Sequence, residues 1–583
     1  MLRSTPPVPF SASWGHGVAP TSASRLKTSR RERLWNDVAV LSLIGKLTER
    51  FETAAGTDPE LRPSTKPQFG HFQSNVALRL AKDQGRSPRD VATDLVARID
   101  VADLCEPLEI AGPGFINIRV RADVLAGVAN DILHDPAAGI DVAEDPARIV
   151  IDYSSPNVAK LMHVGHLRTT IIGDCFHRVL DATGNTVIAQ NHIGDWGRQF
   201  GMLIEQVLEE NLDLSGLDLA GLEELYLRAN AHLTADEAFA DRSRARVVAL
   251  QAGDAETNAL WQELIDISKL GFNATYDRLG VLLTDDDLAG ESMYNDMLAP
   301  ICDDLEARGI AVVDDDALVV FVDGFDAPAI LRNRHGGYGY DVTDVAAISY
   351  RVNTLKADRI VYVTDARQHQ HFLLVFEVAR MAGYLPDSVT AEHVGYGMVL
   401  GTDGKPFSTR KGGAAHLDDL LDQAEEHVAR PIAVAAVKYA DLSNQLQKDY
   451  VFDAERMTQT TGDTGPYLQY AHARVTRILV KAEAEGIAWE TITVLNETPE
   501  HNLALLLSRF GEVVSGVAED LQPHKLCTYL FELATALSVF YEVCPVLTTE
   551  GDVRTSRLGL CSAVRRVLSR GLGLLGIEAP DQM

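Results

Sequence analysis

The pattern of apolar and polar positions predicts that strands and helices alternate between residues 123 and 415. One unit shows this clearly: the apolar run at 147–151 predicts a buried strand, and the helix that follows it stops near Gly184. Apolar residues recur in that helix at the spacing of one helix face, namely Leu167, Ile171, Cys175, Val179 and Leu180. Such alternation is typical of a doubly wound parallel sheet, so we expect an α/β fold.

The segments on either side have other patterns. Before the alternating segment, Ser87 and Pro88 form a favourable helix start, with a capping residue followed by proline at the first helical position. Residues 110–118 predict a turn and then a strand. After about residue 430, apolar residues recur at helical spacing to the end of the chain. A compact α/β unit therefore precedes the alternating segment, and a helical region follows it.

We expect the chain to divide accordingly. The predicted parts are a disordered extension at 1–35, a small domain at 36–122, the α/β domain at 123–429 and a helical domain at 430–583. The α/β domain is interrupted at about 203–335 by an acidic, helix-rich stretch with a strand pair near 311–323, which indicates an insertion.

Composition is that of a folded globular protein without a disulfide framework. The 583 residues are 46% hydrophobic and 23% charged, and no uninterrupted apolar run is long enough to cross a bilayer. The six cysteines are scattered without a C-x-x-C pair, which argues against disulfides or a thiolate zinc site and favours a reducing compartment. The net charge of −30 disfavours nucleic-acid binding unless basic residues gather in a local patch.

The first 31 residues differ from the rest of the chain because they contain no aspartate or glutamate and five lysines or arginines. Such a composition resembles that of an organelle transit peptide. No helical periodicity brings the basic residues to one face, however. We therefore favour a disordered extension, or a start codon placed too far upstream.

The most informative motif lies between the predicted strand and helix. His163 and His166 are separated by a valine and by Gly165 at this turn. The first turn of a helix presents free backbone N–H groups and the positive end of its dipole, which bind phosphate oxygens. Gly165 would let a flat ligand approach the backbone closely. The turn is therefore a candidate phosphate-binding site.

These residues resemble a known family. His163-Val-Gly-His166 is similar to the HIGH signature of class I aminoacyl-tRNA synthetases, and the run from Ser155 to Lys160 that precedes it resembles arginyl-tRNA synthetases in particular. The resemblance extends from about residue 36 to Met583. It implies a Rossmann-like catalytic core with insertions, a small N-terminal α/β domain that binds tRNA and an all-α C-terminal anticodon-binding domain. It also implies that Lys160, His163, Gly165 and His166 bind ATP.

A second segment, from Gly404 to Gly413, resembles the KMSKS loop of the same family. Thr409 stands where the usual motif has its second lysine, and the resemblance implies that Lys160 takes over that charge. Ser408, Arg410 and Lys411 remain candidates for ATP contacts. A basic surface turn is the alternative. The segment is not a Walker loop, because the glycine that such a loop requires is replaced by Val399.

Selection of arginine requires planar acceptors, because a guanidinium group offers five N–H donors in a fixed fork. The resemblance assigns this work to Asp152, Tyr340 and Asp344, the last two lying at i and i+4 on one predicted helix face. It assigns the α-amino and carboxylate end to Asn157 and Gln368, with His163 nearby. Alternatively, Asp344 is a solvated helix acid.

Two further motifs line the same predicted cleft. The His-x-His spacing of His369 and His371 suggests a metal site, but two histidines without further grouped ligands form a poor one. We therefore prefer the D-x-R-Q motif of the family for this segment, and expect no bound metal. The stretch from Asn191 to Gln199 resembles the family's N-H-x-G-D-W-G loop at the end of a strand.

The resemblance also implies contacts with tRNA. Phe115 and Asn117 match positions that meet an unstacked base, where an aromatic ring stacks and an amide reads the base edge. The positions that match those near the anticodon are Tyr467, Tyr470, Tyr541 and Met583. For Phe115 and Asn117, the alternative is a core phenylalanine beside an asparagine at a sheet edge. For each tyrosine, the alternative is packing in the protein core.

Together, the motifs predict a ligase that activates L-arginine with ATP and Mg²⁺ and transfers it to tRNA(Arg). We expect a cytoplasmic monomer with no structural zinc and no membrane partner. Two rivals remain: a catalytically silent relative that only binds tRNA, and another HIGH-type adenylyl-transferring enzyme acting on a small metabolite. The intact Lys160, His163, His166 and Asp344 argue against the first, and the long helical tail argues against the second.

Overall fold

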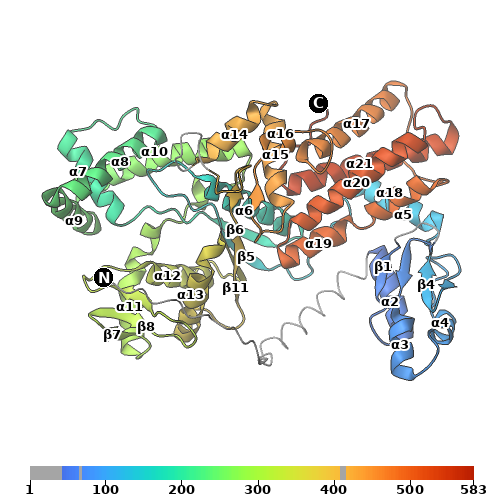
Figure 1. The fold of residues 1–583 in the computed structure, drawn as a ribbon, viewed down its shortest axis with the longest axis horizontal. Coiled ribbons are helices and arrows are strands. Elements are labelled where there is room, and N and C mark those ends of the chain that lie inside the picture. The colour runs from blue at the N-terminus through green and yellow to red at the C-terminus, as the bar shows by residue number, and fades with distance from the viewer. Residues whose placement is uncertain (1–41, 65–68, 408–414) are drawn as a thin grey trace, which may run out of the picture. The chain divides into compact units, whose positions relative to one another are not determined.

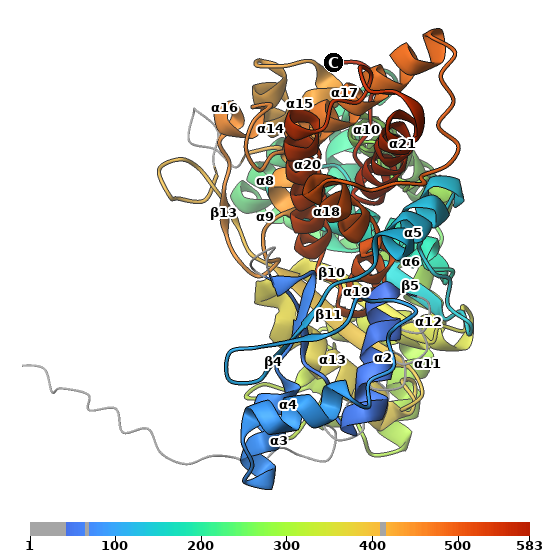
Figure 2. The ribbon, with the colours of Figure 1, turned by 90° about the vertical axis from the view of Figure 1, so that its right-hand side faces the viewer.

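The computed structural model describes residues 42–64, 69–407 and 415–583. The chain divides into two compact units, of which the smaller is drawn in blue in Figures 1 and 2. The smaller unit contains the residues up to 103 together with 107–118, and the larger contains 104–106 and 119–583. The predicted extension at 1–35 lies outside the described residues.

The smaller unit is a four-stranded antiparallel sheet with three helices in its described part. Its sheet order is β1-β2-β4-β3, formed by β1 (Leu61–Pro63), β2 (Phe72–Ser74), β3 (Glu109–Ala111) and β4 (Phe115–Ile118). The helices are α2 (Leu43–Ala55), α3 (Val76–Gln84) and α4 (Pro88–Val96). The predicted start of α4 is confirmed, with Ser87 as N-cap and Pro88 at the first helical position.

The larger unit is organised around a parallel four-stranded sheet with the order β11-β10-β5-β6. Its strands are β5 (Arg148–Asp152), β6 (Thr186–Gln190), β10 (Arg359–Asp365) and β11 (Thr390–Tyr396). Helix α6 (Val164–Ala182) connects β5 to β6, which confirms the strand and helix predicted there. Alternate strand residues, including Val150, Ile360 and Tyr362, share a buried apolar cluster with α12 (Tyr340–Asn353) and α13 (His369–Ala382).

The stretch between the two halves of the sheet contains helices and a small antiparallel sheet, as the insertion pattern predicts. The helices, drawn in green in Figure 1, are α7 (Arg198–Glu210), α8 (Leu219–Ala235), α9 (Glu237–Gln251), α10 (Ala255–Leu279) and α11 (Asn295–Ala307). The sheet consists of β7 (Val312–Asp314), β8 (Ala317–Val320) and β9 (Ala329–Arg332). A short 3₁₀ turn, η3 (Glu291–Tyr294), precedes α11.

The C-terminal part of the larger unit is helical apart from the two-residue strand β13 (Tyr450–Val451), which pairs with β12 (Val399–Leu400). Its helices are α14 (Leu417–Glu425), α15 (Arg430–Leu442), α16 (Ala454–Met457), α17 (Gly465–Ala484), α18 (Thr498–Leu507), α19 (Phe510–Asp520), α20 (His524–Val543) and α21 (Gly551–Leu574). By length and composition alone, α20 is long and apolar enough to cross a membrane, although polar residues interrupt it. Its residues Leu526, Leu530 and Leu533 are buried, as in the core helix of a bundle.

Buried polar contacts join α6 to the C-terminal helices. Arg168 of α6 pairs with Asp441 of α15, with 3.0 Å between Arg168 Nε and Asp441 Oδ2, and both side chains are almost fully buried. Arg168 also donates to the Gly397 carbonyl at 2.7 Å. The helix that begins at the two histidines is therefore anchored both to α15 and to the segment that follows β11.

The chain end after α21 is held by its main-chain carbonyl groups. Lys438 of α15 donates to the Gly576 carbonyl at 2.7 Å. Two side chains of α17 hold the next residues: Gln469 donates to the Glu578 carbonyl at 2.9 Å, and His472 Nδ1 donates to the Pro580 carbonyl at 2.9 Å. The tail thus lies along α15 and α17 up to residue 580.

Candidate functional site

The turn after β5 has an unusual backbone that side chains from other segments hold in place. Ser154 and Ser155 have φ angles of 73° and 48°, which non-glycine residues rarely adopt. The Ser154 N–H donates to Thr169 Oγ1 at 3.1 Å, and the Ser155 N–H donates to Asn191 Oδ1 at 2.9 Å. The Tyr276 hydroxyl lies 2.7 Å from Ser154 Oγ. The turn is therefore fixed before any ligand binds.

The two histidines stack on each other at the start of α6. Their ring centroids lie 3.8 Å apart. His166 Nδ1 accepts from the His163 N–H at 3.1 Å, and His163 Nδ1 accepts from the Gly165 N–H at 3.0 Å. Because each Nδ1 is an acceptor, a neutral ring must carry its proton on Nε2. Both side chains can then donate from Nε2.

The electrostatics keep both rings neutral at pH 7. Burial, reinforced by the positive charges of His163 and Lys160, lowers the pKa of His166 to about 3. Burial also lowers the pKa of His163. The pair therefore offers polar donors without full charge, and the cation of this site is Lys160. Its Nζ lies 4.2 Å from the centroid of the Tyr226 ring.

The expectation that α6 presents free backbone N–H groups is wrong. The Val164 N–H donates to the Ala415 carbonyl at 3.2 Å, the His166 N–H to the His163 carbonyl at 2.8 Å, and that of Gly165 to the His163 ring. Gly165 makes room for the His163 ring: a Cβ at residue 165 would lie only 2.8 Å from His163 Cε1. This requirement for glycine is separate from the close approach of a ligand. Side chains, and not helix amides, are the donors of this turn.

The segment around the second predicted ATP loop is anchored on both sides. Before it, the Phe407 N–H donates to the Val399 carbonyl at 3.0 Å. After it, the Leu417 N–H donates to the Met162 carbonyl at 2.8 Å, next to the two histidines. Ser408, Arg410 and Lys411 lie outside the described residues. The two motifs therefore meet at the residues that flank the loop.

A second cluster lies at the start of α12. Tyr340 and Asp344 both belong to this helix, which confirms their predicted i, i+4 spacing, and Tyr340 is 76% exposed. His371 of α13 bridges two acids of α12, with its Nε2 2.6 Å from Asp344 Oδ2 and its Nδ1 3.2 Å from Asp341 Oδ1. Burial opposes the charge of His371, but these two hydrogen bonds outweigh it and raise its pKa to about 10. His371 is therefore an imidazolium at pH 7.

Glu291 belongs to this cluster, although the sequence did not point to it. Burial and the nearby charges of Asp195 and Asp344 raise the pKa of Glu291 to about 8. Burial, together with the charge of Glu291, raises the pKa of Tyr340. Asp195 fixes the turn that carries Glu291, since its carboxylate accepts from both the N–H and the hydroxyl of Ser292. A half-buried acid that is kept largely protonated beside Asp344 marks a candidate binding site.

Asp152 is paired with a guanidinium group inside the protein. Its Oδ2 lies 2.6 Å from Arg351 Nη2, and its Oδ1 accepts from Ser155 Oγ at 3.0 Å. Arg351 is fully buried and also donates to Gln190 at 2.6 Å. An internal guanidinium therefore already occupies the carboxylate that the sequence suggested for a substrate guanidinium. Asp152 is conformationally fixed at the end of β5.

Asn157 and Gln368, predicted for the other end of the amino acid, are both exposed. Asn157 follows the strained turn and forms a parallel β-bridge with Gly194, and a Cβ at Gly194 would lie 2.9 Å from Asn157 Oδ1. Gln368 is the residue before α13. Both have side chains that remain available to a ligand.

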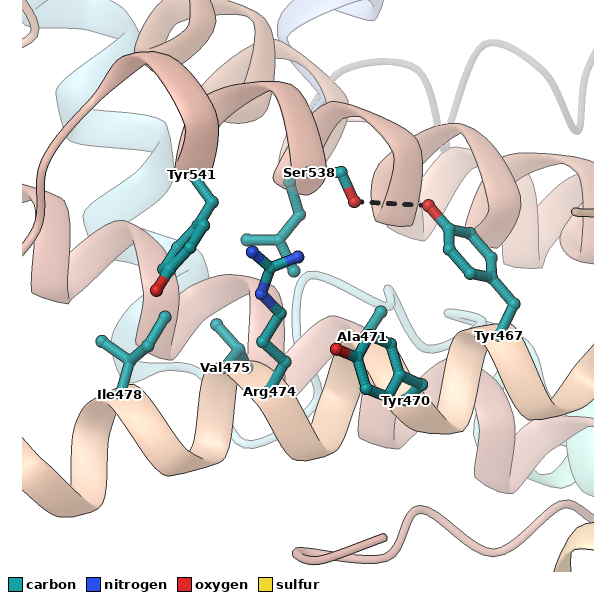
Figure 3. Close-up of a pocket in the computed structure, with 9 residues that line it drawn as sticks. Tyr467, Tyr470, Ala471, Arg474, Val475, Ile478, Ser538 and Tyr541 are labelled. Atoms are coloured by element: carbon teal, nitrogen blue, oxygen red, sulfur yellow. Dashed lines mark hydrogen bonds between the residues drawn. The ribbon is translucent and has the colours of Figure 1, made fainter. Parts of the chain in front are cut away.

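The predicted anticodon-contacting tyrosines gather on α17 and α20. Tyr467, Tyr470 and Tyr541 line one pocket with Arg474, whose guanidinium carbon lies 4.0 Å from the centroid of the Tyr541 ring (Figure 3). Tyr470 and Tyr541 are 45% and 43% exposed, so neither is a core residue. Tyr467 is half-buried, and its hydroxyl lies 3.3 Å from Ser538 Oγ. Met583 is exposed at the chain end.

In the smaller unit, Phe115 and Asn117 differ in their accessibility. Asn117 is 6% exposed, and its Oδ1 accepts from Gln73 on the paired strand β2 at 2.8 Å. Phe115 is half-buried beside the turn at Gly112. The alternative of a core phenylalanine beside an edge asparagine is therefore not what the structure shows, because Asn117 is the more buried of the two side chains.

Within the described residues, no three histidine, cysteine, aspartate or glutamate side chains gather as metal ligands. All six cysteines are free thiols in buried positions. Within the described residues, the groups that these clusters offer to a ligand are Lys160, the histidine pair and the acidic side chains around Asp344.

Comparison with known families finds three matches along the chain. The family described as "tRNA synthetases class I (R), catalytic domain" matches residues 128–430. The N-terminal domain of arginyl tRNA synthetase matches residues 39–120, and the DALR anticodon binding domain matches residues 468–583. Together the three matches cover most of the chain.

Individual relatives agree with the family match. The chain is 66% identical over 554 residues to an arginine–tRNA ligase of Cutibacterium acnes, and the match covers 93% of this chain and 100% of the relative. It is 49% identical to the arginine–tRNA ligase of Thermobifida fusca, with 92% of this chain and 99% of the relative covered. Among solved structures, the arginyl-tRNA synthetase of Plasmodium falciparum superposes with a TM-score of 0.77 at 28% identity, covering 92% of this chain and 98% of that chain. The arginyl-tRNA synthetase of Thermus thermophilus superposes with a TM-score of 0.76 at 25% identity, covering 92% of this chain and 99% of that chain. The chain belongs to the arginyl-tRNA synthetase family.

Proposed function

We propose that the chain catalyses the reaction for which its relatives are named, the ligation of arginine to its tRNA. In the first step, the carboxylate of L-arginine attacks the α-phosphorus of ATP, and the bond to the bridging oxygen breaks, so that pyrophosphate leaves. In the second step, a hydroxyl of the terminal ribose of tRNA(Arg) attacks the carbonyl carbon of arginyl-adenylate, and AMP leaves. The enzyme's task in both steps is to position reactants and to stabilise charge on phosphate oxygens.

We assign the ATP side to the turn before α6. His163 and His166 donate from Nε2 to phosphate oxygens, and Lys160 supplies the full positive charge. Support comes from the stacked, neutral rings with both Nδ1 atoms engaged. Gly165 permits that stack, and Ser408, Arg410 and Lys411 are proposed from the sequence as further contacts.

We assign the guanidinium side to the acidic cluster. Asp344 and Glu291 accept hydrogen bonds from the guanidinium, and Tyr340 covers it. The observation that carries this assignment is the burial of Glu291 beside Asp344, which leaves an acid protonated until a cation arrives. Asn157 and Gln368 are proposed to hold the α-amino and carboxylate groups. Asp152, already paired with Arg351, is proposed to shape the pocket wall and not to bind the guanidinium.

We propose that tRNA binds to both units. The anticodon would bind at the pocket of Tyr467, Tyr470 and Tyr541, where exposed rings can stack on unpaired bases. Three cations of α17, Arg474, Arg477 and Lys481, make no ion pair within the described residues, so a local basic patch exists despite the net charge of −30. Met583 would border this surface, and Phe115 and Asn117 would contact the tRNA from the smaller unit.

The remaining assignments follow from the same residues. We propose that Mg²⁺ binds with ATP, held mainly by phosphate oxygens and water, because the described residues offer no group of three ligands. We propose a monomer in the cytoplasm, since every assigned residue comes from one chain and all cysteines are reduced.

A charging assay tests the function directly. The purified protein is incubated with ATP, total tRNA and each of the twenty amino acids in turn. We expect acid-precipitable product with arginine alone, and pyrophosphate release that depends on arginine. Arginine-independent tRNA binding without pyrophosphate release would identify a silent relative. Pyrophosphate release that does not need tRNA or arginine would identify a small-metabolite enzyme.

A further inference from the structure

Lys160 is held by an aromatic ring and not by a carboxylate. Its Nζ lies 4.2 Å from the centroid of Tyr226, which belongs to α8 of the insertion. Within the described part of the chain, Lys160 makes no ion pair. Lys160 also lies close enough to His163 and His166 to lower the pKa of both rings by its charge. The insertion therefore supplies the aromatic contact of this ammonium group.

A second residue of the same helix contacts the same region. Glu223 precedes Tyr226 by three residues, so the two share one face of α8. Its Oε1 accepts from the Leu161 N–H at 3.3 Å, and its Oε2 lies 3.7 Å from His416 Nε2. His416 in turn forms an antiparallel bridge with His163. One face of α8 thus contacts Lys160 and Leu161, which precede the two histidines, and His416, which pairs with His163.

An aromatic partner suits a lysine whose ammonium group must later bind phosphate oxygens. A carboxylate partner would neutralise the ammonium and would repel a phosphate. A ring face holds the ammonium by its quadrupole, and this attraction is worth only about 0.5–2 kcal/mol, so incoming phosphate oxygens can compete for it. The aromatic partner orients Lys160 and leaves its positive charge available.

We propose that Tyr226 is a positioning residue for Lys160, which holds the ammonium over its ring until the phosphates of ATP replace it. The proposal deepens the ATP-binding role proposed for Lys160 and rests on it. It assigns to the insertion a direct part in activation, carried by the ring and not by the hydroxyl of residue 226.

The test is a double-mutant cycle with a matched control. Tyr226→Leu, Tyr226→Phe and Leu227→Ala are each made in the native and in the Lys160→Ala background, and Leu227 serves as control because it is 61% exposed on the same helix. Arginine-dependent AMP formation with tRNA gives kcat and the KM values for ATP and arginine. Circular dichroism melts check folding, and Tyr226→Met replaces Tyr226→Leu if that variant melts below the assay temperature.

We expect Tyr226→Leu to lower kcat/KM for ATP by about 2- to 30-fold, the range that corresponds to a cation–π contact. The KM for arginine should stay unchanged, and Tyr226→Phe and Leu227→Ala should match the native protein. In the Lys160→Ala background, Tyr226→Leu should cost nothing further. An equal loss in both backgrounds, or a loss in Tyr226→Phe as large as in Tyr226→Leu, would overturn the proposal. Full activity of Lys160→Ala alone would overturn the role of the lysine as well, so the two failures are distinguishable.

Discussion

Replacement of Glu291 by glutamine should remove a pH dependence from arginine binding. In the free enzyme the pKa of Glu291 is about 8, so only about one molecule in ten carries a carboxylate at pH 7. A guanidinium within hydrogen-bond distance lowers a carboxyl pKa by roughly 1–3 units. Binding of arginine should therefore ionise Glu291, and a proton should leave.

The magnitude follows from linkage. With a pKa of about 8 in the free enzyme and between about 5 and 7 in the complex, binding at pH 7 should release about 0.4–0.9 proton. The sign is fixed: a group that must lose its proton to bind makes binding weaker as pH falls. Between pH 8.5 and pH 6, the Kd for arginine should rise by about 7- to 70-fold. His371, with a pKa of about 10, stays charged over this range and adds little.

Isothermal titration calorimetry measures both quantities without tRNA. Arginine is titrated into the protein at several pH values, in pairs of buffers with different ionisation enthalpies, and the difference gives the protons released. In Glu291→Gln the release should fall to about zero, and the Kd should become nearly independent of pH. Proton release that persists in Glu291→Gln would refute the assignment of the titrating group. Unchanged affinity at pH 8.5 would show that Glu291 does not face the guanidinium.

Three further predictions concern other parts of the site. Asp344→Asn should raise the KM for arginine by about 30-fold or more, while the KM for ATP moves little. The reason is that a buried guanidinium that loses its charged partner costs roughly 2–5 kcal/mol. Equal effects on both KM values in the charging assay would contradict this prediction. His166→Ala should lower the rate of activation by about 10²-fold or more, as measured by pyrophosphate release, because it removes a preorganised donor; unchanged turnover would rule this out. Asp441→Asn should lower the unfolding free energy by about 3–5 kcal/mol, because it leaves the buried Arg168 without its counter-ion, and urea unfolding checks this against the exposed control Asp403→Asn.

The parts of the molecule that could be predicted from the sequence are those that depend on local spacing. The strand and helix around His163 follow from periodicity, and the shared helix of Tyr340 and Asp344 follows from an interval of four residues. Contacts between distant segments could not be predicted in this way. Glu291 lies in a stretch with several other acids, so nothing local distinguishes it, and its importance arises only when folding buries it beside Asp344.

The same limit applies to the surroundings of Asp152 and to the amides of α6. Asp152 was assigned to the substrate because its position in the motif is local information. Its partner, Arg351, is 199 residues away in the chain and is brought to it by β10 and α12. The amides of α6 were expected to be free because capping by the preceding histidine and pairing with Ala415 cannot be read from a turn pattern.

The way in which the C-terminal tail is held has a consequence for how this chain can vary. Lys438, Gln469 and His472 bind carbonyl groups of the tail, and every amino acid offers the same carbonyl. Substitutions at Glu578 and Ala579 therefore leave the carbonyl acceptors in place. Gly576 is an exception, because its φ is 66° and a Cβ there would lie 2.6 Å from Lys438 Nζ, and Ile577 is buried. Deletion of a single residue moves each later carbonyl out of register. After Ile577 the tail should therefore tolerate changes of residue but not changes of length, so random mutagenesis there should yield many functional substitutions and few functional deletions.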